Sequence, residues 1–281
     1  MIVSDRFVFV HLHKAGGSWI TDFLLKFFPE SWRVGYHYPR RMIPPSHAGV
    51  PILGVVRNPW DFYVSYHHFQ KGLVERANER NEAMSPGEMK AFVAKGNDPL
   101  NGIDLLFQVL TDDGKAGFKS SAKAVASLCD GGPAFERLLE VLPVGLNRRG
   151  YDTPIQADGF RGMNVLRKDL EAFRGRGDGL FSFLFKHMFS KENGSDHDGQ
   201  IFDDGIEFLK METLREDMPE YLRRIGVDVT REMSDFIQKS EPVNASKHEH
   251  YSKYYDPELV EVVRKHDGRL ADRFGYTFES K

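Results

Sequence analysis

The sequence predicts an α/β fold in which helices flank a central parallel sheet. Segments rich in β-branched and aromatic residues occur at 6–12, 31–37 and 51–58, as is typical of buried strands. Helical patterns follow the first and third of these segments, and glycines or prolines separate them. The resulting order of strand, helix, strand, loop, strand and helix within the first 72 residues favours parallel strands with covering helices.

Each of these elements has a recognisable end. The first strand, RFVFVHL, is followed by Gly16 and Gly17, and the helix at 19–28 stops before Pro29. The prolines of the loop at 38–49 hold it open. The third strand ends at Asn58-Pro59, where proline suits the first turn of the next helix.

The rest of the chain is mainly helical, with one late strand. We expect a single domain, 1–281, in which residues 74–200 form a mainly helical insertion that builds a second ligand pocket. A strand at 205–212 runs into an amphipathic helix that ends at a glycine. Near the end of the chain, Asp256 and Pro257 are typical N-cap and N1 residues of a last helix.

Composition excludes several classes of protein. The chain has 281 residues, of which 41% are hydrophobic and 28% charged, and its net charge is −3. We therefore expect no nucleic-acid partner, because the overall field is not positive, and any anion site must be local. A single cysteine, Cys129, excludes an intramolecular disulfide and a cysteine-based zinc site. With no leader and no long apolar run, we expect a cytoplasmic protein without membrane insertion.

The stretch HLHKAGGSW, residues 11–19, has the pattern of a phosphate-binding turn. It places Gly16, Gly17 and Ser18 at the start of a helix, where backbone amides lack intrahelical partners and carry positive partial charge. Glycine allows an anion to approach these amides, and Lys14 adds a full charge. The alternative is a plain strand-to-helix turn with a solvent-exposed lysine.

A second segment, VVRNPWDFYVSYHH at 55–68, indicates which kind of ligand carries the phosphate. Arg57 ends a strand that we expect beside the first, and Ser65 follows about two helical turns later. A guanidinium group binds a phosphate dianion well, and a serine hydroxyl can complete the site. Two neighbouring anion sites imply a nucleotide with phosphates at two positions.

These segments resemble the sulfotransferases. HLHKAGGSW is similar to the family's 5′-phosphosulfate loop, and VVRNPWDFYVSY to its 3′-phosphate segment. Residues 208–226 resemble its later strand–helix element, and residues 244–259 with FGYTF resemble the C-terminal end of Golgi-type carbohydrate sulfotransferases and related bacterial members. The resemblance covers 6–72 and 205–278. It implies a P-loop-like three-layer fold and 3′-phosphoadenylyl sulfate (PAPS) as sulfuryl donor, with adenosine 3′,5′-bisphosphate (PAP) as product.

The resemblance also implies roles for individual residues. Those expected to hold the 5′-phosphosulfate are Lys14, Ala15, Gly16, Gly17, Ser18 and Trp19. Trp19 is bulkier than the family pattern leads us to expect, so its side chain is expected to pack on the sheet. Arg57 and Ser65 would hold the 3′-phosphate. Ser246 and Lys247, in a tail loop with Asn244, would close over the nucleotide.

The expected chemistry is in-line sulfuryl transfer to a hydroxyl or amine of a small molecule or glycan. Lys14 would stabilise the leaving phosphate, and no metal is expected because a cation already stands beside the leaving group. A histidine would act as general base, and His37 is favoured over His47 because it follows the second strand. The alternative for His37 is a turn histidine bonded to the backbone.

Several other side chains have competing interpretations. His11 and His13 alternate on a strand as a metal pair would, but no third ligand is indicated. Glu212 is expected to brace a strand–helix turn. The basic stretch 148–176 is either a solvated face or a lip for an anionic acceptor. The phenylalanine-rich segment 179–189 either packs a helix on the core or forms a wall of the acceptor pocket.

Two other functions stay open on the sequence. A P-loop-type nucleotide kinase would need the order Gly-Lys-Ser/Thr and an acidic residue for magnesium, and this loop has its lysine before the glycines. A non-catalytic PAP- or nucleotide-binding protein would lack the bridging cation or the base, and both Lys14 and His37 are present.

Overall fold

The computed structural model of the chain describes residues 1–35, 37–94, 105–112, 115–142, 165, 167–192, 201–202, 205–243 and 248–280. The described residues divide into two compact units. The first contains those between 1 and 58 and between 182 and 243, and the second contains those between 59 and 142, 165 and 181, and 248 and 280. The boundaries of the second unit differ from those of the predicted insertion at 74–200. Residues 182–192 belong to the first unit, and residues 248–280 belong to the second.

The first unit is built on a five-stranded sheet of order β3-β1-β2-β4-β5. In chain order, its strands are β1 (Ile2–Val3), β2 (Val8–Val10), β3 (Trp32–Arg33), β4 (Ile52–Val56) and β5 (Ile206–Lys210). The strands β2, β4 and β5 are parallel, with Val10 opposite Gly54 and Gly54 opposite Phe208. All five residues of β4 are buried.

The prediction of a parallel sheet is wrong at one edge, where β1 runs antiparallel to both β2 and β3. A tight turn causes the reversal: the Ser4 amide donates to the Phe7 carbonyl at 3.0 Å, and the Ser4 hydroxyl accepts from the Phe7 amide at 3.2 Å. The second strand is also shorter than the predicted 31–37. His37 has φ 50, a left-handed conformation that no strand accommodates.

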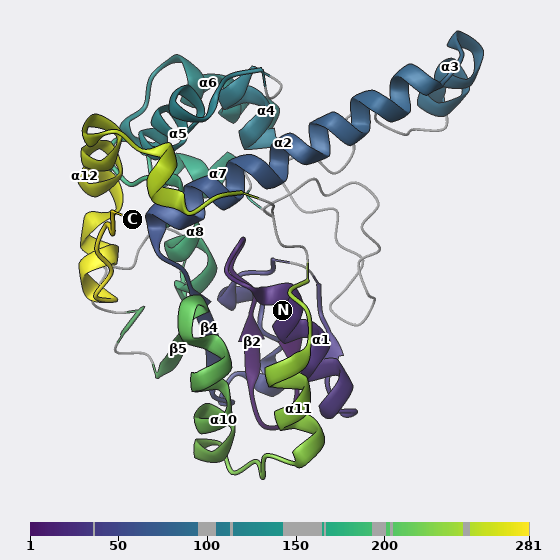
Figure 1. Cartoon of the computed structure of the whole chain (residues 1–281), viewed down its shortest axis with the longest axis vertical. Helices are drawn as coiled ribbons and strands as arrows, with labels where there is room; N and C mark the ends of the chain where they lie inside the picture. The colour runs from purple at the N-terminus through teal and green to yellow at the C-terminus, as the bar shows by residue number, and fades with distance from the viewer. Residues whose placement is uncertain are drawn as a thin grey trace. The chain divides into compact units, whose positions relative to one another are not determined.

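Helices lie on both faces of this sheet (Figure 1). They are α1 (Gly17–Phe27), α8 (Leu180–Phe189, from Ser182 onwards in this unit), α10 (Leu214–Arg224) and α11 (Arg231–Lys239). Three short 3₁₀ turns accompany them: η1 (Arg40–Met42), η2 (Pro45–His47) and η4 (Met211–Thr213).

Aromatic contacts define the layers of this unit. On one face Phe7 packs against Phe28 at the end of α1, with ring centroids 5.0 Å apart. On the other face Phe189 of α8 packs edge-on against Phe208 of β5 at 4.8 Å. Gly54 lies beneath that pair, and a Cβ there would stand 2.8 Å or less from both rings. The phenylalanine-rich segment therefore packs a helix on the core, the first of its two predicted roles.

The described part of the second unit is helical. Its helices and 3₁₀ turns are α2 (Pro59–Ala83), α3 (Pro86–Ala94), α4 (Leu105–Thr111), α5 (Phe118–Ala126), η3 (Leu128–Asp130), α6 (Pro133–Val141), α7 (Arg167–Glu171), η5 (Tyr251–Tyr254) and α12 (Pro257–Arg273). The helix α2 begins at Pro59 as predicted but continues past residue 74, where the insertion was expected to begin.

One polar contact caps α12, and another joins it to α2. The Asp256 carboxylate accepts from the Leu259 amide at 2.9 Å, which confirms the predicted N-cap. The buried Asp267 carboxylate accepts from the Tyr63 hydroxyl of α2 at 2.5 Å. Among the described residues, no helix combines the length and the apolar character needed to span a bilayer.

Candidate functional site

The turn between β2 and α1 has the predicted form of a strand–loop–helix. Two of its residues are left-handed, Lys14 with φ 55 and Gly16 with φ 74, and together they fold the chain into the start of the helix. Gly16 is the N-cap of α1 and has no side chain with which to cap the first-turn amides. Those amides therefore carry the positive end of an 11-residue helix.

The two glycines are needed for different physical reasons. Gly16 occupies a conformation that other residues rarely adopt. Gly17 instead supports close packing, because a Cβ at this position would lie 1.9 Å from the His11 imidazole. The pair therefore fixes the conformation and the packing of the loop.

Arg57 reaches this loop from the end of β4. Its side chain is buried, and Nη1 donates to the Lys14 carbonyl at 3.0 Å. Burial, and secondarily the charge of Arg57, lower the pKa of Lys14 from 10.5 to about 7. The turn thus holds two neighbouring cations whose mutual repulsion an anion would relieve.

Glu212 braces the turn that carries Arg57, as predicted. Its Oε1 accepts a hydrogen bond of 2.7 Å from the Asn58 amide. Glu212 lies in η4, directly after β5, so this bond ties the ends of the two neighbouring strands together. Met211 of η4 and Leu214 at the start of α10 also contact the loop, since each would lie 3.5 Å from a Cβ at Gly16.

Three imidazoles gather beside the loop. The rings of His13 and His37 are stacked with centroids 3.5 Å apart, and those of His11 and His37 lie 4.4 Å apart. Burial is the main cause that lowers the pKa of His37 to about 4 and that of His11 well below 6.5. His11 and His37 are therefore neutral at pH 7.

The tautomer of His37 follows from its hydrogen bond. Its Nδ1 lies 3.0 Å from the His11 carbonyl oxygen, which can only accept. Nδ1 must therefore carry the proton, and Nε2 carries the lone pair. His37 is thus a turn histidine bonded to the backbone, one of its two predicted roles, and its tautomer also leaves Nε2 able to accept a proton.

Of the other predicted residues, His47 lies in η2, whereas Ala15, Ser18 and Trp19 lie in the loop or the first turn of α1. His47 is buried in η2, with its Nδ1 2.9 Å from the Ser46 hydroxyl and its ring edge-on to Trp32 at 5.0 Å. The Trp19 side chain packs beside α11 instead of on the sheet, with Nε1 donating to the Ser240 hydroxyl at 2.7 Å. Ala15 is buried within the loop, and Ser18 is partly buried in the first turn of α1.

Four predicted residues are not placed at this site. Ser65 lies on α2 in the second unit, where its side chain is buried, so its pairing with Arg57 stays a prediction. Ser246 and Lys247 lie outside the described residues, as does Asn244.

Sequence reasoning missed the role of His11 and His13 in this site. They were considered only as a metal pair, whereas His11 packs on Gly17 and His13 stacks on His37. The signal was present, because alternate residues of an extended segment face the same side. Within the described part of the chain, no three His, Cys, Asp or Glu side chains are grouped as metal ligands.

Comparison with known proteins adds no relative: no family model, curated protein or solved structure matches this chain.

Proposed function

We propose that the chain is a sulfotransferase that transfers a sulfuryl group from PAPS to a hydroxyl or amine of a small molecule or glycan. One observation carries the proposal: two buried or partly buried cations, Lys14 and Arg57, meet at the N-terminal end of a helix. Backbone amides with positive partial charge and paired cations are the groups that bind phosphate and sulfate esters.

The residues present suit the donor. In this proposal, Lys14 and the amides of the first turn of α1 bind the 5′-phosphosulfate, and Arg57 binds the 3′-phosphate. Arg57 has five N–H donors and gives one of them to the Lys14 carbonyl. The P-loop-like character of the turn belongs to this proposal, and the roles of Ser65, Ser246 and Lys247 stay predictions from the sequence.

Bound PAPS supplies an activated sulfuryl group joined to its 5′-phosphate through a bridging oxygen. As that bond breaks, Lys14 would neutralise the charge that develops on the phosphate, an interaction weighted towards the transition state. An anionic ligand also raises the pKa of a neighbouring ammonium group, so Lys14 would be charged in the complex.

His37 is the proposed general base. Its Nε2 lone pair would accept the acceptor's proton while the acceptor oxygen or nitrogen bonds to sulfur. The His11 carbonyl holds Nδ1–H at 3.0 Å and fixes the tautomer needed for this role. A pKa of about 4 keeps the imidazole unprotonated at neutral pH, although it also makes the base weak until the anionic donor binds.

A second function has one observation in its favour. The stacked, backbone-bonded position of His37 is what a purely structural histidine would have. A non-catalytic protein that binds PAP or a related nucleotide would need the cations of the loop but no base. Two measurements separate these functions: PAP binding and the release of PAP from PAPS. A sulfotransferase should show both, and a non-catalytic protein should show binding alone.

Thermal unfolding with different nucleotides tests the donor class. PAP should raise the melting temperature, and ATP with magnesium should leave it nearly unchanged; the reverse result would favour a P-loop kinase and overturn the proposal. Arg57→Ala should weaken PAP binding but spare adenosine 5′-phosphosulfate, which lacks the 3′-phosphate. Arg231→Ala, at a side chain 98% exposed in the same unit, is the matched control and should change neither.

A further inference from the structure

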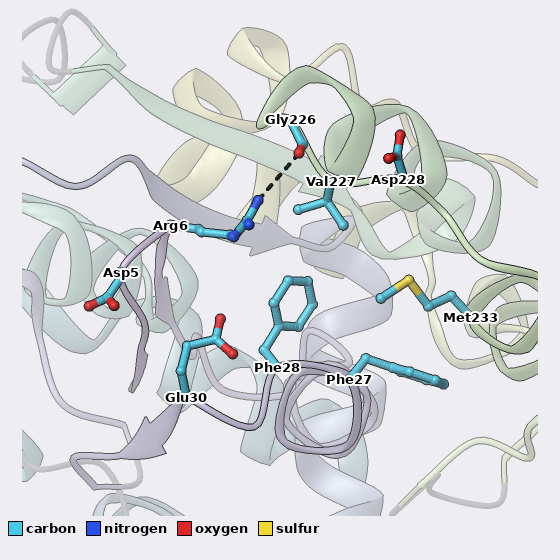
Figure 2. Close-up of a pocket in the computed structure, with 9 residues that line it drawn as sticks. All are labelled: Asp5, Arg6, Phe27, Phe28, Glu30, Gly226, Val227, Asp228 and Met233. Carbon is cyan, nitrogen blue, oxygen red and sulfur yellow. Dashed lines mark hydrogen bonds between the residues drawn. The ribbon is translucent and has the colours of Figure 1, made fainter.

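A pocket lies at the opposite end of the first unit from Lys14. It has a volume of about 560 Å³, within the ~300–1,000 Å³ typical of small-molecule sites. Four segments line it: the residues before β2, the end of α1, the turn after α10, and α11 (Figure 2). The turn that contains Lys14 joins one end of β2 to one end of α1, and the start of α10 contacts this turn. The other ends of β2, α1 and α10 lie at the pocket.

The floor of the pocket is apolar. Phe27 and Phe28 at the end of α1 face Val227 and Met233 across it (Figure 2). Phe28, Val227 and Met233 are buried, so the floor is part of the packed structure. Such a surface suits the hydrocarbon body of a ligand.

The rim of the pocket is negatively charged. It carries three exposed carboxylates, Asp5, Glu30 and Asp228, and within the described residues none of these carboxylates forms an ion pair or hydrogen bond. Among the described residues that line the pocket, the one cation is Arg6, whose Nη1 donates to the Gly226 carbonyl at 3.3 Å (Figure 2). The lining therefore has a net charge of −2, from three acids and one arginine.

Two helix ends add to this negative potential. The helices α1 and α10 both terminate at the pocket, and the carbonyl end of a helix carries negative partial charge. Two basic side chains of the last turns have partners elsewhere: Lys26 pairs with Glu232 at 3.1 Å, and Arg224 pairs with Glu207 and Glu220. Neither of these two basic residues lines the pocket. A third, Arg223, is exposed and does not line the pocket.

We propose that this pocket binds an organic cation with an apolar body, such as an aromatic or alkyl primary amine. The carboxylates of Asp5, Glu30 and Asp228, spread around the rim, attract the ammonium group, and the hydrocarbon part lies on the floor formed by Phe27, Phe28, Val227 and Met233. The first unit then binds an anion at one end of its helices and a cation at the other. This inference does not depend on the sulfotransferase proposal.

Titrations of the full chain, followed by amide NMR, test this inference with four small probes. Benzylamine should shift the amide signals of Gly226, Val227 and Asp228, and it should bind about five- to tenfold more tightly than the neutral benzyl alcohol. Methylamine, which lacks the apolar body, should bind more weakly than benzylamine. Equal affinity for benzyl alcohol, tighter binding of benzoate, or shifts confined to other residues would overturn the inference.

Charge variants give the second arm of the test. Glu30→Gln with Asp228→Asn should reduce benzylamine affinity to that of benzyl alcohol. The control pair, Asp22→Asn with Glu241→Gln, makes the same charge change at exposed carboxylates that do not line the pocket, and it should leave the affinity unchanged. Because all four side chains are exposed, folding should survive in both variants. Unchanged binding in the first pair, or equal losses in both, would contradict the inference.

Discussion

Lys14 destabilises the ligand-free protein, because burial and Arg57 lower its pKa to about 7. The unfolded chain, with its lysine pKa near 10.5, binds more protons than the folded chain between these two values. The destabilisation is therefore full below pH 7, shrinks as the pH rises, and is absent above about 10.5.

Lys14→Met should consequently raise the melting temperature of the ligand-free protein at pH 7 and abolish its stabilisation by PAP. The substitution keeps most of the side-chain volume and removes the buried charge. Lys239→Met, at an exposed lysine, is the control and should not raise it. A lower melting temperature for Lys14→Met would show that the lysine supports the fold and not a ligand.

The same titration predicts a pH dependence of donor binding. PAP binds the charged form of Lys14, so its affinity should decrease as the pH rises from 7.5 to 9, where the phosphates are already dianionic because their second pKa is about 6. Calorimetry over this range should detect proton uptake on binding. The Lys14→Arg variant stays charged over this pH range, so its PAP affinity should change less with pH. If its affinity changes with pH as steeply as that of the wild type, another group causes the pH dependence.

At His37 the role as base can be separated from the role in the turn. Asparagine tolerates the left-handed conformation, and its side-chain amide can replace the Nδ1–H donor to the His11 carbonyl, but it accepts no proton. His37→Asn should fold normally, bind PAP as the wild type does, and release PAP from PAPS roughly 10²–10⁴-fold more slowly. His47→Asn should retain the rate; the opposite pattern would move the base to His47.

Among the elements, the start of α1 depends on the contact between Gly17 and His11. Gly17→Ala should destabilise the protein by about 2–3 kcal/mol, within the range of overpacked cores, because its Cβ would meet the imidazole. Adding His11→Ala removes the obstacle and should recover much of that loss, as measured by denaturant unfolding in a double-mutant cycle. Gly16→Ala is strained by its φ of 74 instead, so His11→Ala should not rescue it. Additive losses at Gly17 and His11 would contradict the packing explanation.

How much of each element could be predicted depended on how local its signal is. The starts of α2 at Pro59 and α12 at Asp256-Pro257 follow from residues within one turn, and both predictions are confirmed. The strand β1 has only two residues, too few for any periodic pattern, so the antiparallel edge was missed. The length of α2 was missed because Gly72, a common helix stop, lies within it.

Contacts between distant residues explain what sequence reasoning could not find in the site. The stack of His13 on His37 joins residues from two loops, and it requires the left-handed turn at His37. The hydrogen bond from the Asn58 amide to Glu212 joins strand ends 154 residues apart. The sequence predicted that Glu212 braces a turn, but it did not identify Asn58 as the partner. The role of Lys14 in an anion site was predicted from local pattern, but its lowered pKa follows from burial beside Arg57.

On the scale of the first unit as a whole, charge is arranged along the helices. The N-terminal end of α1 lies beside Lys14 and Arg57, whereas its C-terminal end lies beside unpaired carboxylates. The net charge of −3 gives no hint of this polarity, since it averages over both ends. The proposed anion site would therefore be local, as the composition leads us to expect.

A crystal structure with PAP bound tests the central claim most directly. The account predicts the 5′-phosphate against Lys14 and the first amides of α1, and the 3′-phosphate within hydrogen-bonding distance of the Arg57 guanidinium. It also predicts that the bond from Arg57 to the Lys14 carbonyl and the brace from Glu212 persist. PAP bound away from this turn, or a turn whose two cations face away from the nucleotide, would contradict the account.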